Sequence, residues 1–409
     1  MSMSETRIIT GIDVGTTAIK VLIAESDEKG DPIFLGYGSA PAVGLRRGVV
    51  VNMEKTLESI THAVEDAEMM AATSIGSAVA GITGDHVKSL NSQGVIAISR
   101  SDNEIGERDV QKAIEAASAI AIPNDREIIH VLPQDYTIDE QPGIKNPVGM
   151  TGVRLEVEVH IVTAAVTSAR NIFRSIERCD IAVDHLVLQS LASSYACVSP
   201  EEEDMGVALI DIGGDLTDVS VFYDGSIHHT GVVPLGGRNV TNDITIGLRT
   251  SLDQAEKLKI TYGSALTSLV DPEDMMEVTT AVGREPKQIS RNVLASIIEP
   301  RMEEIFTLVQ REIKKAGATE PLAAGAVLTG GGAQLPGIID LAEQILDMPV
   351  KIGIPCGIEG LPDNIVTPDK ATTIGLLLYG HRHGTGAEIA RGGIKGFIKK
   401  IEGWISNNF

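Results

Sequence analysis

The chain has 409 residues, of which 43% are hydrophobic and 22% charged, and its formal net charge at pH 7 is -22. Its length and composition predict a folded protein of two to four domains. The excess of 56 acidic over 34 basic residues argues against nucleic acid as a partner. No run of 18 uncharged apolar residues occurs, and Glu5 and Asp13 interrupt the apolar stretch that a signal peptide needs. We therefore expect a protein that is made and kept in the cytoplasm.

Strand-like and helix-like segments alternate along the chain, which is typical of layered α/β domains. Apolar residues at helical spacing predict helices over 54–72 and 107–122. A long helix is expected over 291–315, entered or kinked at Pro300. Runs rich in Val and Ile predict strands at RIITGIDVG, AIKVLIAES, GVALIDIGG and TDVSVFYDG.

Two of these regions form an internal repeat. The segments IITGIDVGTTAIKVLIA and VALIDIGGDLTDVSVFY each read as an apolar strand, an Asp, a Gly-containing turn and a second apolar strand. The two aspartates, Asp13 and Asp211, are 198 residues apart (211 minus 13), about half the chain. Two related domains that face each other would place both turns on opposite walls of one cleft.

The two turns are candidate phosphate-binding loops, because a tight Gly-containing turn directs backbone N–H groups at an anion. Either turn alone is more often an ordinary hairpin, whereas the matching pair favours a phosphate site. Asp13 and Asp211 are expected to hold a metal ion through water, since a triphosphate and several carboxylates would otherwise repel one another. The expected phosphate-binding positions are Gly15, Thr16 and Thr17 in the first turn, and Gly213, Gly214 and Thr217 in the second.

A third Gly-rich segment, AVLTGGGAQLPGI, predicts a strand, three bare glycines and a helix that opens near Pro336. A flat base could lie against such backbone, although a flexible loop fits the residues equally well. The helical segment SLDQAEKLKITYG carries Glu256 and Lys259 on one face. A surface ion pair is the default interpretation of these two residues, and contact with ribose hydroxyls and the base is the sharper one.

In this order, the segments resemble the actin superfamily of nucleotide-binding proteins. GIDVGTT and LIDIGGDLTD correspond to its two phosphate loops, VLTGGGAQLPG to its adenosine loop, and LQSLASSYA and ATTIGLLLYG to its two linking helices. The resemblance implies ATP and Mg²⁺ as ligands, with Gln189 and Asp211 as catalytic candidates. Gln189 matches a water-orienting Gln, and a plain helix-face Gln is the alternative. The further nucleotide-binding positions are Gly236, Gly237, Glu256, Lys259, Gly330, Gly331 and Gly332.

The stretch HVLPQDYTIDEQPGIKNPVGMTGVRLEVEVHIVTA, over 130–164, is similar to a characteristic segment of the bacterial cell-division family FtsA. The segments ERCDIAVDHLVLQSLASSYA, IIEPRMEEIF and VLTGGGAQLPGI are similar to that family as well, so the resemblance runs from about residue 7 to the end. It implies an actin-like ATPase fold with two facing domains in four subdomains. Their expected bounds are 1–83, 164–195 and 366–383 for subdomain 1A, 84–163 for 1C, 196–227 and 302–365 for 2A, 228–301 for 2B, 384–393 for a linker and 394–409 for an amphipathic helix.

FtsA proteins bind ATP, form filaments, anchor the tubulin-like protein FtsZ to the membrane at mid-cell and recruit later division proteins. The resemblance therefore implies these partners here. Rapid ATP hydrolysis does not follow from the sequence, and we predict slow turnover at most. Lys287 and Arg301 match basic positions that dock the FtsZ tail, and solvated surface charge is the alternative interpretation.

The second phosphate loop departs from the family pattern. The family usually has three glycines followed by Thr, whereas this chain has Asp215 and Leu216 after Gly213 and Gly214. Asp215 adds a carboxylate close to the expected phosphate. We expect that it turns outward, joins the water shell of the metal or lowers the affinity for nucleotide.

The last residues, IKGFIKKIEGWISNNF, predict a helix whose apolar side chains fall within an arc of about 120°. A Gly-rich linker, HRHGTGAEIARGG, precedes it, and residues 391–409 carry four basic residues and one acidic, a net of +3. A helix packed on the protein's own core is the alternative to one that lies on the cytoplasmic face of an anionic cell membrane. The expected membrane contacts are Ile394, Phe397, Ile398, Ile401, Trp404 and Ile405, flanked by Lys395, Lys399 and Lys400.

Three other proteins of the same superfamily remain as alternatives. A small-molecule kinase would need a general base in a closed pocket, and no residue in the sequence singles itself out for that role. A DnaK-type chaperone would need a peptide-binding β domain, for which about 30 residues after TTIGLLLYG leave no room. A pilus-assembly actin homologue is close in fold, and the segment IKNPVGM favours FtsA over it.

Overall fold

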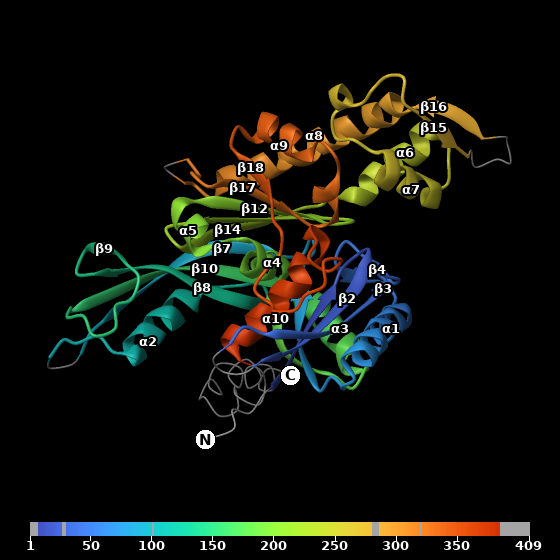
Figure 1. Cartoon of the computed structure of the whole chain (residues 1–409). Helices are drawn as coiled ribbons and strands as arrows, with labels where there is room; N and C mark the ends of the chain where they lie inside the picture. The colour runs from blue at the N-terminus through green and yellow to red at the C-terminus, as the bar shows by residue number, and fades with distance from the viewer. Residues whose placement is uncertain (1–6, 27–29, 100–101, 280–285, 319–320, 385–409) are drawn as a thin grey trace.

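Two five-stranded sheets with the same topology form the centre of the molecule (Figure 1). The structure is a computed structural model that describes residues 7–26, 30–99, 102–279, 286–318 and 321–384. The strands of the first sheet are β1 (Arg7–Val14), β2 (Ala18–Ser26), β3 (Ile33–Pro41), β6 (Ser77–Ile82) and β11 (Ala182–Leu188). Those of the second are β12 (Val207–Ile212), β13 (Thr217–Tyr223), β14 (Ser226–Val233), β17 (Gly325–Thr329) and β18 (Val350–Ile352).

The strand orders confirm the predicted internal repeat. The first sheet runs β3-β2-β1-β6-β11 and the second β14-β13-β12-β17-β18. In each, the first strand of the predicted hairpin pairs antiparallel with the second and parallel with a strand from later in the chain. The two hairpins therefore occupy equivalent places in their sheets.

The first sheet and the helices on its two faces form lobe 1. Helices α1 (Met53–Ala71) and α3 (Val166–Glu177) cover one face, where Ile12, Val21 and Ile60 belong to a buried core. Helices α4 (Gln189–Cys197) and α10 (Ala371–His383) cover the other face. The core around these two helices continues into the second sheet, so they join the two halves of the molecule. A short hairpin, β4 (Leu45–Arg46) and β5 (Val49–Val50), completes lobe 1.

The second sheet and its helices form lobe 2. Helix α8 (Arg291–Lys315) has the predicted bounds and includes Pro300 within its length. It packs with α9 (Ile338–Leu346) beside the sheet, and it also contacts α6 (Gly237–Leu248) and α7 (Leu252–Tyr262). The hairpin of β15 (Met275–Val278) and β16 (Lys287–Ser290) lies beside α6 and α7 at one corner of the molecule, and α5 (Pro200–Met205) lies at another (Figure 1).

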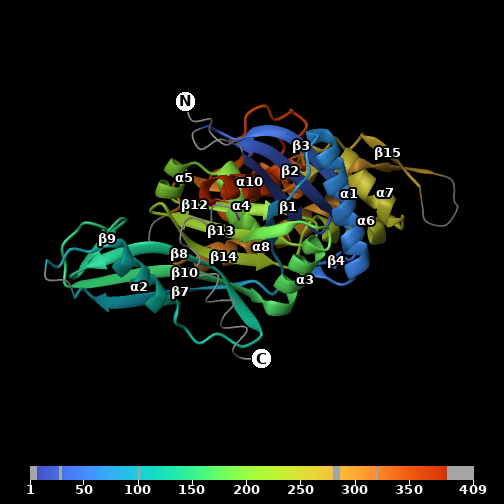
Figure 2. The ribbon, with the colours of Figure 1, turned by 90° about the horizontal axis from the view of Figure 1, so that it is seen from below.

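Residues 88–165 build a separate sheet of order β7-β10-β8-β9 that projects from the side of the molecule (Figure 2). Helix α2 covers it and shares its core, which includes Ala113 and Leu155. The sequence predicted that this helix extends to 122, but it ends at Ser118. Pro123 disfavours helical backbone at the residue before it, so a helix has to end ahead of that position. The elements are β7 (Lys88–Ala97), α2 (Glu107–Ser118), β8 (Arg126–Ile138), β9 (Gln141–Ile144) and β10 (Arg154–Ala165).

This added sheet rests on lobe 2 through the edge strand β14. The Gln134 side-chain amide donates to the carbonyl of Ile227 at 2.8 Å, and His160 Nε2 lies 3.0 Å from the Thr230 hydroxyl. Both contacts are buried, so they are shielded from water and fix the added sheet against β14.

The predicted membrane helix and most of its linker lie outside the described residues, which end at Gly384. Among the described residues, no helix is both long enough and apolar enough to cross a membrane.

Candidate functional site

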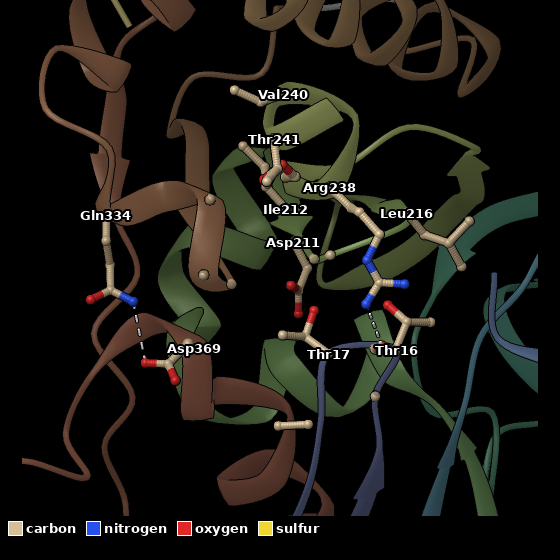
Figure 3. Close-up of a pocket in the computed structure, with 18 of the residues that line it drawn as sticks. Thr16, Thr17, Asp211, Ile212, Leu216, Arg238, Val240, Thr241, Gln334 and Asp369 are labelled. Atoms are coloured by element: carbon tan, nitrogen blue, oxygen red, sulfur yellow. Dashed lines mark hydrogen bonds between the residues drawn. The ribbon is translucent and has the colours of Figure 1, made fainter. Parts of the chain in front are cut away.

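A cavity of about 680 Å³ lies between the two lobes, a volume typical of small-molecule sites (Figure 3). The β1–β2 turn contributes to one wall and the β12–β13 turn to the other, as the repeat predicted. Most of the residues expected to bind nucleotide line this cavity. They are Asp13, Gly15, Thr16, Thr17, Gln189, Asp211, Gly213, Gly214, Gly237, Glu256, Lys259, Gly330, Gly331 and Gly332.

Two of the expected positions, Thr217 and Gly236, do not line the cavity. The Thr217 side chain is fully buried, and its hydroxyl donates to the carbonyl of Leu235 at 2.9 Å. A Cβ on Gly236 would stand 2.6 Å from the carbonyl oxygens of Gly213 and Gly214. Both residues therefore brace the second turn from behind, which strand alternation in the sequence alone did not reveal.

Some glycines of the site allow close approach of other atoms, and one leaves open space in the cavity. Gly330 has φ +81°, and a Cβ there would stand 2.4 Å from Asp211 Oδ1. A Cβ on Gly214 would stand 2.1 Å from the Thr17 hydroxyl, so the β1–β2 and β12–β13 turns meet across the cleft. Gly331 is different, because a Cβ added there would have no neighbour closer than Asp369, at 4.0 Å. Its bare backbone therefore borders open space in the cavity, where a flat group could lie.

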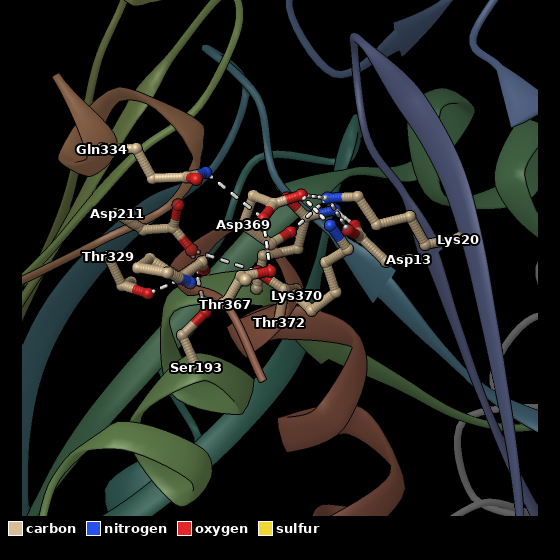
Figure 4. A network of polar contacts seen from close by, with 12 residues as sticks. Asp13, Lys20, Ser193, Asp211, Thr329, Gln334, Thr367, Asp369, Lys370 and Thr372 are labelled. Carbon is tan, nitrogen blue, oxygen red and sulfur yellow. Dashed lines mark hydrogen bonds and ion pairs between the residues drawn. The ribbon is translucent and has the colours of Figure 1, made fainter. Parts of the chain in front are cut away.

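Asp13 and Asp211 are buried carboxylates held by hydrogen bonds (Figure 4). The Gln189 amide donates to Asp13 Oδ1 at 2.9 Å. Two hydroxyls, from Ser193 at 2.9 Å and Thr372 at 3.0 Å, donate to Asp211 Oδ2. Burial raises the pKa of Asp13 to about 6, although the charge of a nearby lysine opposes the rise, and burial also raises the pKa of Asp211.

Lys20 places a positive charge beside the carboxylates of Asp13 and Asp369, and the sequence motifs did not indicate it. Its Nζ lies 3.8 Å from Asp13 Oδ2 and 4.0 Å from Asp369 Oδ2, and it also donates to the Asp369 carbonyl. Lys20 is paired directly opposite Asp13 in the β1–β2 hairpin. Facing residues of an antiparallel pair share one side of the sheet. The hairpin register was therefore the signal that could have found Lys20.

The equivalent pair in the second hairpin is Asp211 and Asp218, which are also directly opposite each other. Asp218 is buried, lines the cavity and accepts a hydrogen bond from the Thr83 hydroxyl of lobe 1. Burial raises the pKa of Asp218 to about 7, with a further rise from the charges of Asp211 and Asp13. Sequence reasoning missed this buried carboxyl of the cleft as well.

Glu256 and Lys259 form the expected ion pair on α7, with 2.8 Å between Glu256 Oε2 and Lys259 Nζ. The lysine side chain is only 15% exposed. It also donates to the Gly237 carbonyl at 3.1 Å and to the Thr241 hydroxyl at 2.9 Å. The pair therefore fixes the start of α6 against α7 at the wall of the cavity, which is more than a solvated surface pair does.

The carboxylates suit a magnesium ion chemically. Mg²⁺ prefers oxygen ligands and keeps several of its waters, so it is commonly held by one or two carboxylates and substrate phosphates. Burial raises the pKa values of Asp13 and Asp211, and a divalent cation beside them would favour their charged forms. Among the described residues, no three acidic, histidine or cysteine side chains form a group that could hold an ion on their own.

Asp215 turns away from this cavity. Its carboxylate instead lines a smaller cavity of about 350 Å³ on the other side of the second turn. There it accepts a hydrogen bond from the Arg47 N–H at 3.0 Å and forms an ion pair with Arg238 at 3.0 Å. The sequence left three outcomes open for Asp215, and in the structure its side chain turns outward, away from the large cavity.

The two expected docking residues both belong to the region of β16 and α8. Lys287 is exposed at the start of β16. Arg301, on α8, has a side chain only 25% exposed and forms ion pairs with Asp243 at 2.6 Å and with Glu304. Arg301 therefore has a structural role in addition to any contact with a partner.

Comparison with known proteins decides the family. A family model described as cell division protein FtsA matches residues 208–375, and one described as the SHS2 domain inserted in FtsA matches residues 84–163. The chain is 44% identical over 411 residues to the cell division protein FtsA of Neisseria meningitidis, covering 98% of this chain and 99% of the relative. The chain belongs to the FtsA family.

Other FtsA relatives are similar along their full length. The Pseudomonas aeruginosa protein is 40% identical over 417 residues, covering all of both chains, and the Escherichia coli K12 protein is 35% identical over 419 residues, covering 99% of each. This FtsA-family chain is therefore a cell-division protein. The kinase, chaperone and pilus-assembly alternatives are set aside by that membership.

Solved structures establish the fold of this FtsA-family chain. The PilM–PilN type IV pilus biogenesis complex matches with a TM-score of 0.66 at 17% identity, covering 91% of this chain and 98% of that one. MreB5 of Spiroplasma citri bound to ADP matches with a TM-score of 0.54 at 15% identity, covering 93% of this chain and all of that one. At such identities the likeness shows the fold alone. The predicted actin-like α/β fold is confirmed.

Proposed function

We propose that this FtsA-family chain binds ATP with Mg²⁺ in the cavity between its lobes and works as a membrane tether for FtsZ at the division site. The observation that carries the proposal is the meeting of three Gly-containing turns and the buried carboxylates Asp13 and Asp211 around one cavity. A triphosphate needs hydrogen-bond donors on both sides and a cation among the carboxylates. The turns offer donors on both sides of the cavity, and the carboxylates suit a bound Mg²⁺.

In this proposal the phosphates lie between the two hairpin turns. The backbone N–H groups around Gly15 and Gly214 and the hydroxyls of Thr16 and Thr17 would hold them. Lys20 balances part of the negative charge of Asp13. The base would lie against the backbone of Gly331, with Glu256 and Lys259 at the edge of the cavity toward the ribose.

We propose at most slow hydrolysis of the bound nucleotide. Gln189 is the residue that would orient a water toward the terminal phosphate, and Asp211 would assist through its place beside the metal. The Gln189 amide is already engaged by Asp13 at 2.9 Å. A side chain that must leave an existing hydrogen bond before it can position water is compatible with slow turnover.

The membrane tether is the amphipathic segment over 394–409. Partial burial of its six apolar side chains at roughly 1 kcal/mol each, with about 1 kcal/mol per Lys near anionic lipid, gives a reversible anchor. Folding a short helix offsets part of that gain. A filament that presents many tails binds firmly through avidity. Self-association into filaments therefore belongs to the proposal, and a likeness in fold to the MamK double helical filament is compatible with it.

The four-subdomain division expected from the sequence remains part of the proposal. The FtsZ tail would dock on the region of Lys287 and Arg301. The sheet formed by residues 88–165 would contact a neighbouring subunit, and later division proteins would be recruited to the assembled filament on the cytoplasmic face of the cell membrane.

The proposal is tested with the full chain, vesicles rich in phosphatidylglycerol and a labelled FtsZ tail peptide. We expect Mg²⁺–ATP to bind to the chain in solution, and chain and peptide to sediment together with the vesicles. Trp404→Glu should abolish sedimentation while ATP binding is unchanged. Ser406→Glu places the same charge in the same segment outside the apolar arc and should still sediment. Sedimentation of the Trp404→Glu variant would reject the tether, and absence of ATP binding would reject the nucleotide site.

A further inference from the structure

The ion pair between Asp215 and Arg238 lies where the two lobes meet. Asp215 is in the β12–β13 turn of lobe 2, and Arg238 is in the first turn of α6, also in lobe 2. Arg238 Nη1 lies 3.0 Å from Asp215 Oδ1. The sequence alone indicated no partner for the Asp215 carboxylate. In the fold its partner is Arg238, 23 residues farther along the chain (238 minus 215).

Both members of the pair reach across the cleft to lobe 1. The Asp215 carboxylate accepts the Arg47 N–H at 3.0 Å, and the Asp215 N–H donates to the Thr16 hydroxyl at 3.2 Å. Arg238 Nη2 donates to the Thr16 carbonyl at 3.1 Å (Figure 3). Three hydrogen bonds thus connect this one ion pair to two separate loops of lobe 1, the β1–β2 turn and the β4–β5 turn.

The pair is buried on one side and accessible on the other. The Asp215 side chain is 8% exposed and that of Arg238 is 41% exposed. A carboxylate with so little water depends on its partners, and loss of one partner is costly. Arg238 lines both the large cavity and the smaller cavity behind the second turn, so the arginine forms part of the wall between them.

The contacts involve the loop that is proposed to hold phosphate. Thr16 offers its hydroxyl to Asp215 and its carbonyl to Arg238, so the pair fixes both the position and the orientation of this residue. A glycine at position 215 would keep the backbone contact to Thr16 and lose both contacts made by the carboxylate. The acidic side chain therefore adds a connection between lobes that a bare turn cannot make.

We propose that Asp215 and Arg238 are positioning residues that clasp the two phosphate-binding turns together across the cleft and thereby slow the release of bound nucleotide. The inference rests on the proposed nucleotide site. Release requires the lobes to separate at these turns, and separation breaks the contacts of Asp215 with Arg47 and of Arg238 with Thr16. The clasp acts on the rate of opening and makes no contact with the base.

The first test is a double-mutant cycle on the full chain, with the dissociation rate of a fluorescent ATP analogue and Mg²⁺ as the readout. We expect Asp215→Ala and Arg238→Ala each to release nucleotide about fivefold to tenfold faster, and the double variant to fall short of the product of the two single effects, because each residue helps to hold the other in place. Asp215→Asn keeps an acceptor for Arg47 and loses the charge, so it should fall between the parent and Asp215→Ala. Additive effects of the two alanine variants, or unchanged release, would overturn the clasp.

The control is Arg178→Ala, which removes an ion pair of similar length, 2.9 Å to Glu54, that lies wholly within lobe 1. It should leave nucleotide release at the parental rate. Thermal midpoints of all variants are measured alongside. Arg238→Ala leaves the buried Asp215 carboxylate without its cation and should melt at a lower temperature, so Asp215→Ala, which removes that carboxylate, decides the test. Faster release in Asp215→Ala with a midpoint that matches that of the control supports the clasp, whereas a midpoint that falls in step with faster release contradicts it.

The second test needs no nucleotide. Hydrogen exchange of the segment 44–50 is measured in the nucleotide-free parent and in Arg238→Ala. No hydrogen bond or ion pair described for Arg238 involves this segment, whereas Asp215 accepts the Arg47 N–H, so faster exchange of that N–H reports loss of the contact that Asp215 makes with lobe 1. We expect exchange at least threefold faster, and parental exchange would overturn the clasp. If the variant exchanges faster and the parent binds no ATP, the nucleotide site fails while the contact between lobes stands.

Discussion

Gln189, the first residue of α4, donates a 2.9 Å hydrogen bond from Nε2 to Oδ1 of Asp13 on β1. The contact connects α4 to β1, and both side chains lie at the wall of the cavity. The sequence left open whether Gln189 orients water or is a plain residue of the helix face. Because Gln189 lies at the wall of the cavity, its replacement tests whether it orients water.

We expect Gln189→Ala to lower slow ATP hydrolysis at least tenfold, because a group that positions water contributes on the order of a hundredfold. ATP affinity should change less than threefold, since the backbone donors of the turns remain. Single-turnover hydrolysis with protein in excess measures the first quantity and equilibrium binding the second. Gln310→Ala, on α8 and outside the cavity, is the control. Equal hydrolysis in Gln189→Ala and parent would leave Gln189 a plain helix residue.

The open space in front of Gly331 gives a second prediction. Gly331→Val adds a branched side chain where an added Cβ meets nothing nearer than 4.0 Å, so the fold tolerates it and the cavity loses room. We expect ATP affinity to fall at least tenfold, measured by calorimetric titration with Mg²⁺ present.

The matched control is Gly76→Val, because an added Cβ at Gly76 also meets no atom within 4 Å and this glycine is outside the cavity. Both variants should melt within a few degrees of the parent. Parental affinity in Gly331→Val would show that the base does not lie against this loop.

Asp218 predicts how stability depends on pH. The ordinary pKa of Asp, 3.8, is raised to about 7 in the fold, chiefly by burial. Between these values the folded chain binds the proton more tightly than the unfolded chain, so this group makes stability fall as pH rises from about 4 to about 7. Asp13, with its pKa raised to about 6, adds a fall of the same sign that ends near pH 6.

We expect Asp218→Asn to flatten this fall and to raise the free energy of unfolding at pH 8 by about 2 kcal/mol. The amide oxygen can still accept the Thr83 hydroxyl, so the geometry is kept. Denaturant unfolding of the nucleotide-free chain from pH 5 to pH 8 measures the effect. The exposed Asp253→Asn on α7 is the control and should follow the parent. A slope in Asp218→Asn as steep as the parental one would contradict the prediction.

Lys287 and Arg301 should differ in what their loss does to the fold. Arg301→Ala breaks the contact with Asp243 at 2.6 Å, and because both side chains are about a quarter exposed we expect a loss of stability of about 1 kcal/mol. Lys287→Ala, in an exposed position, should leave stability unchanged.

Both variants should weaken binding of the FtsZ tail peptide severalfold, measured by fluorescence anisotropy. Lys55→Ala, exposed on α1 of lobe 1, is the control for loss of one positive charge and should bind as the parent does. Equal peptide affinity in Lys287→Ala, Arg301→Ala and the control would move the docking site elsewhere.

Local pattern was sufficient for much of the fold. The alternation of apolar strands with Gly-containing turns predicted both hairpins, and their spacing predicted that the two turns would face each other across one cavity. The bounds expected for α8, 291–315, are confirmed, and Pro300 lies inside the helix. These features depend on neighbours in the chain, whose geometry is fixed by strand and helix repeats.

The sequence by itself determined that Asp13 and Asp211 come just before Gly-containing turns and that the chain repeats itself at half its length. Only the tertiary structure decided that Asp215 points away from the cavity and that Thr217 is buried behind it. The direction of the Asp215 side chain depends on Arg47, in the β4–β5 turn of lobe 1, and on Arg238, in the first turn of α6. A buried carboxylate is stable only where it has partners, and here the folding of lobe 2 supplies Arg238 and the docking of the two lobes supplies Arg47.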